Sequence, residues 1–484
     1  MTSENDRTSA EASLQALDER LAASPGDVEL RFRRAGLLAS LGRFEAARAA
    51  YFAVLADVPR HLNALNDFGT LLHANGFVSA ARTCYAEAVA HHPDAPMPRV
   101  NLANILLEDG DLASARVQYE ITLAQVPLQP EAHQGLARIL AELGEDDAAA
   151  RHRHLGFHDR FLTELPYHGA GEGIPLLELV AASGGNIPTR VLIDNRKYRC
   201  SVVVADFFDP AMPLPPHAAV FNAIGDADLA RGALQAAEGL LARTTAPVVN
   251  APRAVLLTGR ADNARRMAAI PGLVAPRTMT FPRAALADVS TLRAQGFSFP
   301  LLLRRPGFHT GRHFLRVDAP ERLAEAVAAL PGAELTAIEF LDACGSDGSV
   351  RKYRVMVADG ALYPMHVAVA TDWKVHYFSA DMAERPDHRA EEARFLADMP
   401  HALGTSAIAA LEAVRDVLTL DYGGVDFGLD RYGNVLLFEA NATMVVNPPE
   451  PDPRWDYRRR PVTRIIDAVH AMLARRAGLR ICSS

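Results

Sequence analysis

The chain has 484 residues, which is too long for one compact hydrophobic core, so we expect two or three domains. Hydrophobic residues make up 49% of the chain and charged residues 22%, ordinary values for globular proteins. The formal net charge of −8 gives no reason to expect a nucleic acid or a membrane surface as partner, and no apolar run of about 18 residues predicts a membrane span.

The first residues, MTSENDRTSAEAS, are polar and lack the apolar stretch of a secretory signal. Four cysteines are scattered along the chain without metal-ligand spacing, which is typical of free thiols in a reducing compartment. We therefore expect a cytoplasmic protein. The cysteines are Cys84, Cys200, Cys344 and Cys482.

The first third of the chain repeats with a period of 34 residues, and five columns of residues hold that spacing. Glycine, alanine, tyrosine and proline each form one column, and small residues form the fifth. The columns are Gly42, Gly76, Gly110 and Gly144; Ala47, Ala81, Ala115 and Ala149; Tyr51, Tyr85 and Tyr119; Pro25, Pro59, Pro93 and Pro127; Ala35, Gly69, Ala103 and Ala137.

Each column has a structural role in a stack of helix pairs. The glycine lies in the turn between two helices, the alanine lies where helices cross, the tyrosine fills the groove to the next repeat, and the proline ends the second helix. Over residues 12–155 the pattern resembles the tetratricopeptide repeat family. It departs from that family early in the first helix of each repeat, where Arg31, Leu65 and Arg99 replace a large aromatic residue.

Stacked helix pairs of this kind present a concave groove, and the resemblance implies a protein or peptide partner in it. The alternative is that the array only docks on its own C-terminal domain or forms a homodimer. The histidine-rich stretch 151–158 has no acid or cysteine spacing that would complete a metal site, so we expect a solvated helix end there.

After the repeat, the composition of the chain changes twice. Residues 156–188 lose the period and fill with Gly and Pro, which is typical of a linker. Short apolar strands and helices then alternate over 189–277, which predicts a parallel α/β sheet with strands near 191–194, 201–208 and 219–225. Hairpins and helices over 278–475 predict an α+β domain, with a long helix at 405–418.

The last predicted hairpin carries the strongest chemical signal. If the turn at 431–434 pairs Asp430 with Val435, Asp426 lies opposite Glu439, and Asn441 lies on the same face. Opposed and buried carboxylates destabilise a hairpin unless a cation sits between them. Two carboxylates and an amide oxygen suit Mg²⁺, with Mn²⁺ as an alternative ion. The other interpretation is that each acid pairs with an arginine of the core.

The sequence D-F-G-L-D followed by F-E-A-N resembles the metal-binding strands of the ATP-grasp superfamily, in its glutathione synthetase and ribosomal S6 modification branches. The resemblance covers roughly residues 190–472. It implies that Asp426, Glu439 and Asn441 hold one or two metal ions beside the phosphates of ATP. It further implies that Glu339, Phe340 and Leu341 form the hinge that contacts the adenosine, and that Arg354 faces the phosphates or an acyl substrate.

Two segments depart from the superfamily. Arg304 stands where its phosphate-binding lysine is expected, and it keeps the positive charge with a different geometry. The segment 307–312 stands where a glycine-rich flap is expected, and it places His309 and Arg312 near the phosphates. Lys374 either replaces the missing lysine or forms a plain salt bridge.

By resemblance, a carboxylate substrate attacks the γ-phosphate of ATP, and an amine or thiol then displaces phosphate from the acyl phosphate. Arg304, Arg354 and Lys374 would offset the developing negative charge. We therefore expect a multidomain protein, an all-α solenoid followed by α/β and α+β parts, acting as an ATP- and Mg²⁺-dependent carboxylate–amine ligase. Two alternatives stay open: an ATP-grasp phosphotransferase, and a scaffold that binds nucleotide without turnover.

Overall fold

The computed structural model describes residues 3–307, 311–375, 377 and 380–479. The chain divides into two compact units. The first comprises the chain up to Phe161 with residues 165–174 and 195–199, and the second comprises 162–164, 175–194 and everything from Cys200 onward. Within the described residues, no helix combines the length and the apolar character that crossing a bilayer requires.

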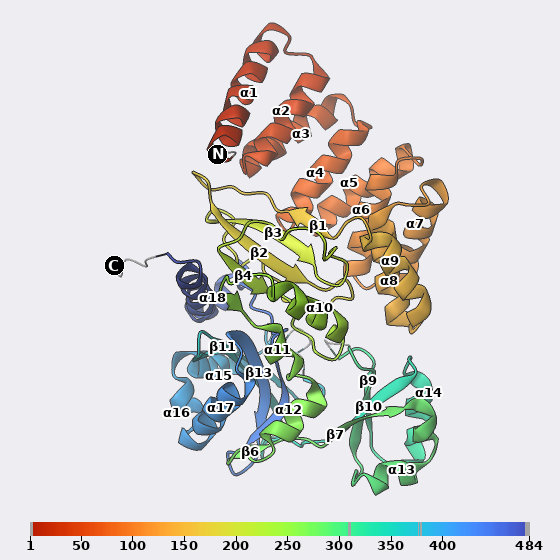
Figure 1. The fold of residues 1–484 in the computed structure, drawn as a ribbon, viewed down its shortest axis with the longest axis vertical. Coiled ribbons are helices and arrows are strands. Elements are labelled where there is room, and N and C mark those ends of the chain that lie inside the picture. Colours follow the sequence, from red (N-terminus) through yellow and green to blue (C-terminus); the bar gives the residue numbers. More distant parts are fainter. Residues whose placement is uncertain (1–2, 308–310, 376, 378–379, 480–484) are drawn as a thin grey trace. The chain divides into compact units, whose positions relative to one another are not determined.

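The first unit is built from consecutive antiparallel helices, drawn from red to yellow-brown in Figure 1. Their bounds are α1 Ser3–Ala23, α2 Val28–Ser40, α3 Phe44–Asp57, α4 Leu62–Ala74, α5 Val78–His91, α6 Pro96–Glu108, α7 Leu112–Gln125, α8 Pro130–Leu143 and α9 Asp146–Phe157. The helices α1, α3, α5 and α7 each end two residues before the proline of the repeat, as predicted.

The residue columns of the repeat take the positions that the period predicts. All four turn glycines, from Gly42 to Gly144, have φ between 70° and 85°, a conformation that glycine adopts at no steric cost. The alanine column is fully buried, and the tyrosines Tyr51, Tyr85 and Tyr119 are at most 3% exposed. The helical solenoid predicted from the sequence is therefore confirmed.

Small residues in the first helix of a repeat make room for a tyrosine of the same repeat or of the preceding one. A Cβ atom on Gly69 would lie 2.6 Å from a ring carbon of Tyr85, and one on Gly135 would overlap the ring of Tyr119. The two hydroxyl groups are bonded as well, Tyr119 donating to Asn104 at 2.6 Å and Tyr85 lying 3.0 Å from Thr70 Oγ1. The tyrosines therefore hold the two helices of a repeat together through hydrogen bonds, and Tyr119 also packs against the next repeat.

The second unit begins with a five-stranded sheet in the order β1-β3-β2-β4-β5. β2, β4 and β5 are parallel, whereas β1 pairs antiparallel with β3. The elements are β1 Leu162–Glu164, β2 Ile174–Val180, β3 Tyr198–Val204, β4 Ala219–Asn222, α10 Arg231–Leu241, β5 Val248–Val249, α11 Pro252–Leu256 and α12 Arg260–Met267.

Two predictions fail in this sheet. The segment 156–188, predicted as a linker, contains β1 and β2, and the predicted strand at 191–194 consists of turns. The apolar run of β2 is largely buried, as is usual for a central parallel strand, but the glycines and prolines around it hide this signal in the sequence. A Gly- and Pro-rich composition marks turns, and those turns lie at the ends of strands.

A four-stranded antiparallel sheet follows in the order β7-β10-β8-β9. Its strands are β7 Thr278–Pro282, β8 Leu301–Arg304, β9 Phe314–Val317 and β10 Glu334–Glu339, and its helices are α13 Val289–Ala294 and α14 Leu323–Ala329. Leu286, Leu292, Leu301, Leu303 and Leu335 form its buried core together with aromatic residues from β7 and the turn before β8.

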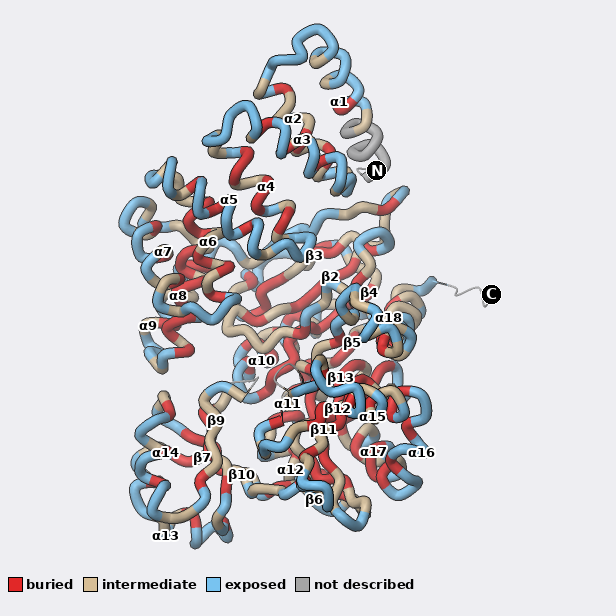
Figure 2. The backbone as a smooth tube through the Cα atoms, turned by 180° about the vertical axis from the view of Figure 1, so that it is seen from behind, coloured by how far each residue is buried: buried red, intermediate tan, exposed pale blue. Residues whose placement is uncertain are grey.

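The last sheet has the order β12-β11-β13-β14-β6, antiparallel except for the short parallel pair β14–β6. Its strands are β6 Leu273–Val274, β11 Val350–Ala358, β12 Ala361–Ala370, β13 Tyr422–Leu429 and β14 Val435–Asn441, accompanied by α15 Pro386–Ala397, α16 Met399–Leu403, α17 Thr405–Leu418 and α18 Asp456–Arg476. Figure 2 shows buried residues in red along β11 and β13. The α+β prediction and the helix at 405–418 are confirmed.

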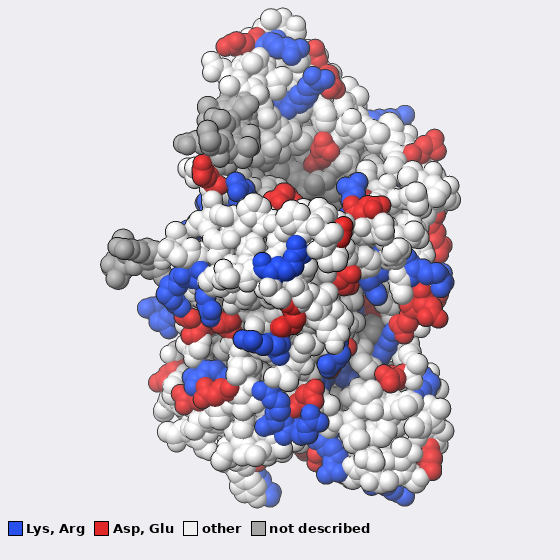
Figure 3. Space-filling model, in the orientation of Figure 1, with Lys and Arg blue, Asp and Glu red and all other residues white. Residues whose placement is uncertain are grey.

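Acidic and basic side chains lie side by side on the face drawn in Figure 3, without one large field of a single sign. Many of them form exposed ion pairs, such as Arg33 with Glu29 at 3.0 Å. Exposed pairs of this kind contribute little stability.

Candidate functional site

Four polar side chains lie in register across neighbouring strands of the last sheet. His366 on β12 is paired with Arg354 on β11, Arg354 with Asp426 on β13, and Asp426 with Glu439 on β14. Residues paired directly across a sheet project from the same face. We call His366, Arg354, Asp426 and Glu439 the charged row.

The predicted register of the hairpin is correct at the acids and wrong at the turn. Val435 pairs with Leu429, not with Asp430, and a bulge between Asp426 and Phe427 restores the predicted pairing of Asp426 with Glu439. Asn441 lies beside Glu439, as expected, and its amide donates a hydrogen bond of 2.8 Å to the Glu439 carboxylate. The three proposed metal ligands therefore lie close together.

Asp426 is held by two cations of β11. Arg354 donates from Nε and Nη2 to its two oxygens at 2.6 and 2.8 Å, and the Lys352 ammonium lies 2.9 Å from Oδ2. Burial alone would raise the pKa of Asp426, but the charges of Arg354 and Lys352 outweigh burial and hold the pKa well below its usual range. This carboxylate is ionised at every physiological pH.

Glu439 pairs with Arg260, a residue of α12 that the sequence analysis did not single out. Arg260 also lies 3.6 Å from Asp228, and these acids raise its pKa although its burial works in the other direction. The side-chain oxygen of Asn441 accepts hydrogen bonds from the Thr443 amide and hydroxyl at 3.0 and 2.9 Å. Both carboxylates of the predicted metal site are thus ion-paired in this structure.

Arg304, at the end of β8, is a buried cation with an incomplete set of partners. Its side-chain Nε is buried and has no hydrogen-bond partner among the described residues, and its guanidinium lies 5.3 Å from the centre of the Phe314 ring. Burial, and then the nearby charge of Arg260, lower the pKa of Arg304 to about 9, against the attraction of Glu439, Asp226 and Asp228. Such a group is stabilised by an additional anion.

The predicted hinge residues lie next to an aromatic cluster. Phe340 meets the Trp373 ring at 6.3 Å between ring centres, and the Arg316 guanidinium lies 5.2 Å from the Phe340 ring centre. Trp373 in turn meets Phe314 at 5.5 Å, so the cluster is continuous with Arg304.

The other predicted residues have structural partners or lie elsewhere. The Glu339 carboxylate accepts from the Arg277 backbone amide at 3.0 Å, and Leu341 packs against the apolar cluster around Ala343. Lys374 donates to the Phe314 carbonyl at 3.3 Å and forms no salt bridge with an acid among the residues that the structure describes. Arg312 is exposed, and His309 lies outside the described residues.

The sequence analysis missed two of the three cations that pair with the acids, Lys352 and Arg260. Lys352 lies two residues before Arg354, so strand alternation alone would have placed it on the face of the charged row. Arg260 comes from a helix 179 positions away in the sequence from Glu439, and no local pattern connects the two.

The set of Asp426, Glu439 and Asn441 is chemically suited to a hard divalent cation, because two carboxylates and an amide lie together. No group of three or more His, Cys, Asp or Glu side chains within the described part of the chain is placed to hold a metal ion. A metal ion here would therefore take ligands from Asp426, Glu439 and Asn441, with the rest from a bound substrate or water. Binding requires that the cations paired with the two acids give way.

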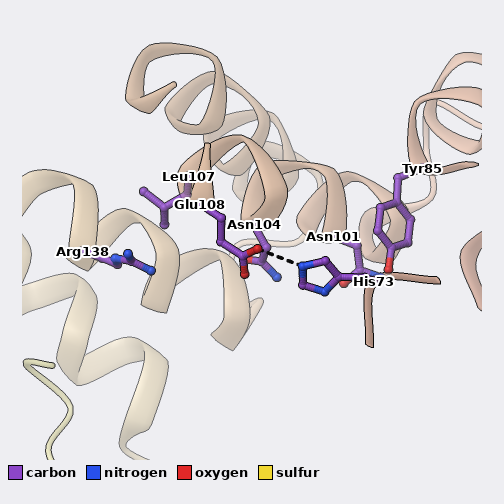
Figure 4. A pocket seen from close by; sticks show the side chains of 7 residues that line it. All are labelled: His73, Tyr85, Asn101, Asn104, Leu107, Glu108 and Arg138. Atoms are coloured by element: carbon purple, nitrogen blue, oxygen red, sulfur yellow. Dashed lines mark hydrogen bonds and ion pairs between the residues drawn. The ribbon is translucent and has the colours of Figure 1, made fainter. Parts of the chain in front are cut away.

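The helical array has a polar pocket of its own, of about 150 Å³. His73 of α4 and Glu108 of α6 are joined across it by a contact of 2.8 Å, shown as a dashed line in Figure 4. Asn101 of α6 donates to Asn66 of α4 at 2.9 Å. Arg138 of α8 is exposed at the pocket and forms no ion pair within the described residues. The lining is His73, Tyr85, Asn101, Asn104, Leu107, Glu108 and Arg138.

Comparison with known proteins bears on the helical array. A tetratricopeptide repeat family model matches residues 66–120 and 100–152. Together with the geometry of the helices and the residue columns, this match supports tetratricopeptide repeats in the N-terminal helical array. No curated protein matches the chain.

Solved structures that are similar to the chain align with about a third of it. MamA from Desulfovibrio magneticus RS-1 is 23% identical, with 30% of this chain and 83% of that chain covered and a TM-score of 0.28. PilF of Pseudomonas aeruginosa is 21% identical, with 32% of this chain and 70% of that chain covered and a TM-score of 0.30.

Proposed function

We propose that the second unit binds ATP with Mg²⁺ and acts as an ATP-grasp carboxylate–amine or carboxylate–thiol ligase. The observation that carries this proposal is the charge arrangement around Arg304. A buried guanidinium with an unpartnered Nε on one sheet lies within the electrostatic reach of Glu439, which stands on a second sheet beside Asp426 and Asn441. Phosphate oxygens would pair with Arg304, and a divalent cation would bind the acids on the second sheet.

The architecture of residues 278–475 supports the same proposal. An antiparallel four-stranded sheet with two helices is followed, after β10, by a larger sheet that carries the charged row. Two α+β halves joined by one connecting segment are the arrangement that the ATP-grasp resemblance implies. The aromatic residues Phe340 and Trp373 lie at that connection, where stacking on an adenine ring would be favourable.

The residues of the chain would act mainly by positioning and by neutralising charge. Bound Mg²⁺ would supply charge neutralisation between the phosphates. Arg304 and Arg354 would stabilise the negative charge that develops as a substrate carboxylate oxygen attacks the γ-phosphorus and ADP departs. An attacking amine or thiol would then bond to the acyl carbon, lose its proton and release orthophosphate.

One observation favours a second candidate function, a scaffold that binds nucleotide without turnover. Asp426 uses both oxygens for Arg354 and Lys352, and Glu439 is paired with Arg260. If these pairs persist with ATP present, no metal reaches the acids. A phosphotransferase is the third alternative, and its stable phosphorylated product would identify it.

Replacing Glu439 by alanine tests the metal assignment. We expect Mg²⁺-dependent ATP binding, measured by calorimetry, to fall by at least about a hundredfold, because a charged ligand of the metal is lost. Glu450→Ala is the control, since that side chain is exposed. Unchanged ATP binding in Glu439→Ala would contradict the proposed metal site.

The products of turnover separate the three functions. With candidate acceptors present, ADP with free orthophosphate indicates ligation, a stable phosphorylated acceptor indicates transfer, and binding without ADP release indicates a scaffold.

The described cysteines Cys84, Cys200 and Cys344 are free thiols, which supports a cytoplasmic location for this activity.

For the repeat array, we propose that its polar pocket binds an acidic segment of a partner protein. Arg138 is the cation offered there, and Asn101 and Asn104 can exchange hydrogen bonds with an extended backbone. Arg138→Ala should weaken binding of a partner identified by affinity capture by about tenfold. Arg33→Ala is the control, because Arg33 is already paired with Glu29 on the surface. Equal losses for both variants would contradict a specific role of the pocket.

A further inference from the structure

Both oxygens of the Asp426 carboxylate are already bonded by cations in this structure. Arg354 takes one hydrogen bond to each oxygen, and the Lys352 ammonium lies 2.9 Å from Oδ2. A divalent cation beside Asp426 would also be repelled by the positive charge of Lys352 at this short range. Lys352 therefore competes with a metal ion for Asp426.

Lys352 depends on Asp426 for its charge pairing. The lysine side chain is only 17% exposed, and Asp426 is the one acidic partner that it contacts in the described part of the chain. A largely buried ammonium that loses its counter-ion is strongly destabilised by its incomplete solvation unless another anion replaces the lost partner. Arg354 differs from Lys352, because its planar guanidinium forms two bonds to Asp426 from directly across the sheet.

We propose that Lys352 is an exchangeable counter-ion: it occupies the metal position on Asp426 in the ligand-free protein and transfers to a phosphate group of the ligand when a divalent cation binds. This inference rests on the proposed binding of ATP and metal to the charged row. Its consequence is that metal and phosphate ligand bind cooperatively, because each removes an obstacle to the other. Coupling between two sites is reciprocal, so Lys352 should affect both affinities.

The variant Lys352→Met separates the two roles of the side chain, with Mn²⁺ and ATP as probes. Mn²⁺ binding without nucleotide, followed by electron paramagnetic resonance, should tighten by about tenfold, because the competing charge is gone. ATP binding at saturating Mn²⁺, measured by calorimetry, should weaken by about tenfold, because a phosphate partner is gone. Arg354 keeps Asp426 paired, so we expect the variant to fold.

Opposite changes in the two affinities distinguish exchange from a merely structural role, which would weaken both. Arg351→Met is the matched control, since Arg351 lies next to Lys352 on the other face of β11 and pairs with Asp347 and Glu391. It should leave both affinities unchanged. If the wild-type protein binds ATP and Lys352→Met binds Mn²⁺ no more tightly, the exchange is refuted and the proposed function stands. If the wild-type protein binds no ATP at any metal concentration, the proposed function itself fails.

Discussion

The repeat array and the charged row differ in how their key residues find their partners. In the array, tyrosines pack against small residues of an adjacent helix, Tyr85 against Gly69 and Tyr119 against Gly135, and these contacts lie within one repeat along the sequence. In the charged row, Asp426 pairs with residues more than 70 positions away and Glu439 with one 179 positions away. The array is a product of local periodicity, whereas the site exists only after distant strands and a helix have assembled.

The largest effect that we expect comes from breaking the charged row. Arg354→Met removes two of the bonds to Asp426 and leaves a buried carboxylate with Lys352 alone. Breaking a buried pair in this way costs about 3–5 kcal/mol, because the remaining charge is undercompensated. Hydrogen exchange measured by mass spectrometry should show faster exchange in β11 and β13 and unchanged exchange in α2 to α9.

The control for Arg354→Met is Arg351→Met on the same strand. The pairs of Arg351 with Asp347 and Glu391 are partly exposed to solvent, so their loss should cost less than about 1 kcal/mol. Equal destabilisation by the two variants would show that unpairing the buried Asp426 costs no more stability than unpairing the partly exposed acids. Faster exchange throughout the array would show that the two regions are not independent.

A smaller effect is expected from the packing of the array. Gly135→Ala places a methyl group against the ring of Tyr119, which is fully buried and tied to Asn104, so the ring cannot move aside. Overpacking of this kind costs about 1–3 kcal/mol, which denaturant unfolding of the array will measure.

The matched control lies on an equivalent helix of another repeat. At Gly36 the nearest atom to an added Cβ is the Tyr51 hydroxyl oxygen at 3.6 Å, an ordinary contact. Gly36→Ala should therefore stabilise its helix by about 0.5–1 kcal/mol. Stabilisation by Gly135→Ala would contradict the close packing between Tyr119 and its neighbouring repeat.

The difference between local and distant contacts explains which parts of the structure the sequence predicts. A fixed period predicts the turn glycines and buried tyrosines of the array, and strand alternation predicts that Asp426 faces Glu439. Neither rule predicts the bulge at Phe438 or the ion pair between Arg260 and Glu439. Both depend on how distant elements pack. The sequence analysis weighed a metal ion against core arginines as partners of these acids, and the structure contains the arginine pairs.

The smallest expected effect concerns two histidines that join α8 to α9. The Nδ1 atoms of His133 and His152 are 2.8 Å apart, and His133 Nε2 lies 3.0 Å from the Pro127 carbonyl. Because a carbonyl only accepts, His133 carries its proton on Nε2, and its Nδ1 accepts from His152. Protonating His152 would add a positive charge to this partly buried contact.

Acid should therefore weaken the contact between α8 and α9. Burial, followed by the charges of His133, Arg151 and Arg116, lowers the pKa of His152 below 6.5, while Glu120 has the opposite effect. A histidine whose pKa is lower in the folded state binds more protons when unfolded, so its contribution to stability is complete above about pH 6.5 and declines as the pH falls. Urea unfolding at pH 7.5 and 5.5 should show a smaller free energy of unfolding at pH 5.5, and His152→Gln should reduce this difference. If the difference between the free energies of unfolding at the two pH values is the same in His152→Gln, other groups cause the pH dependence. Acid would then not weaken the contact between α8 and α9.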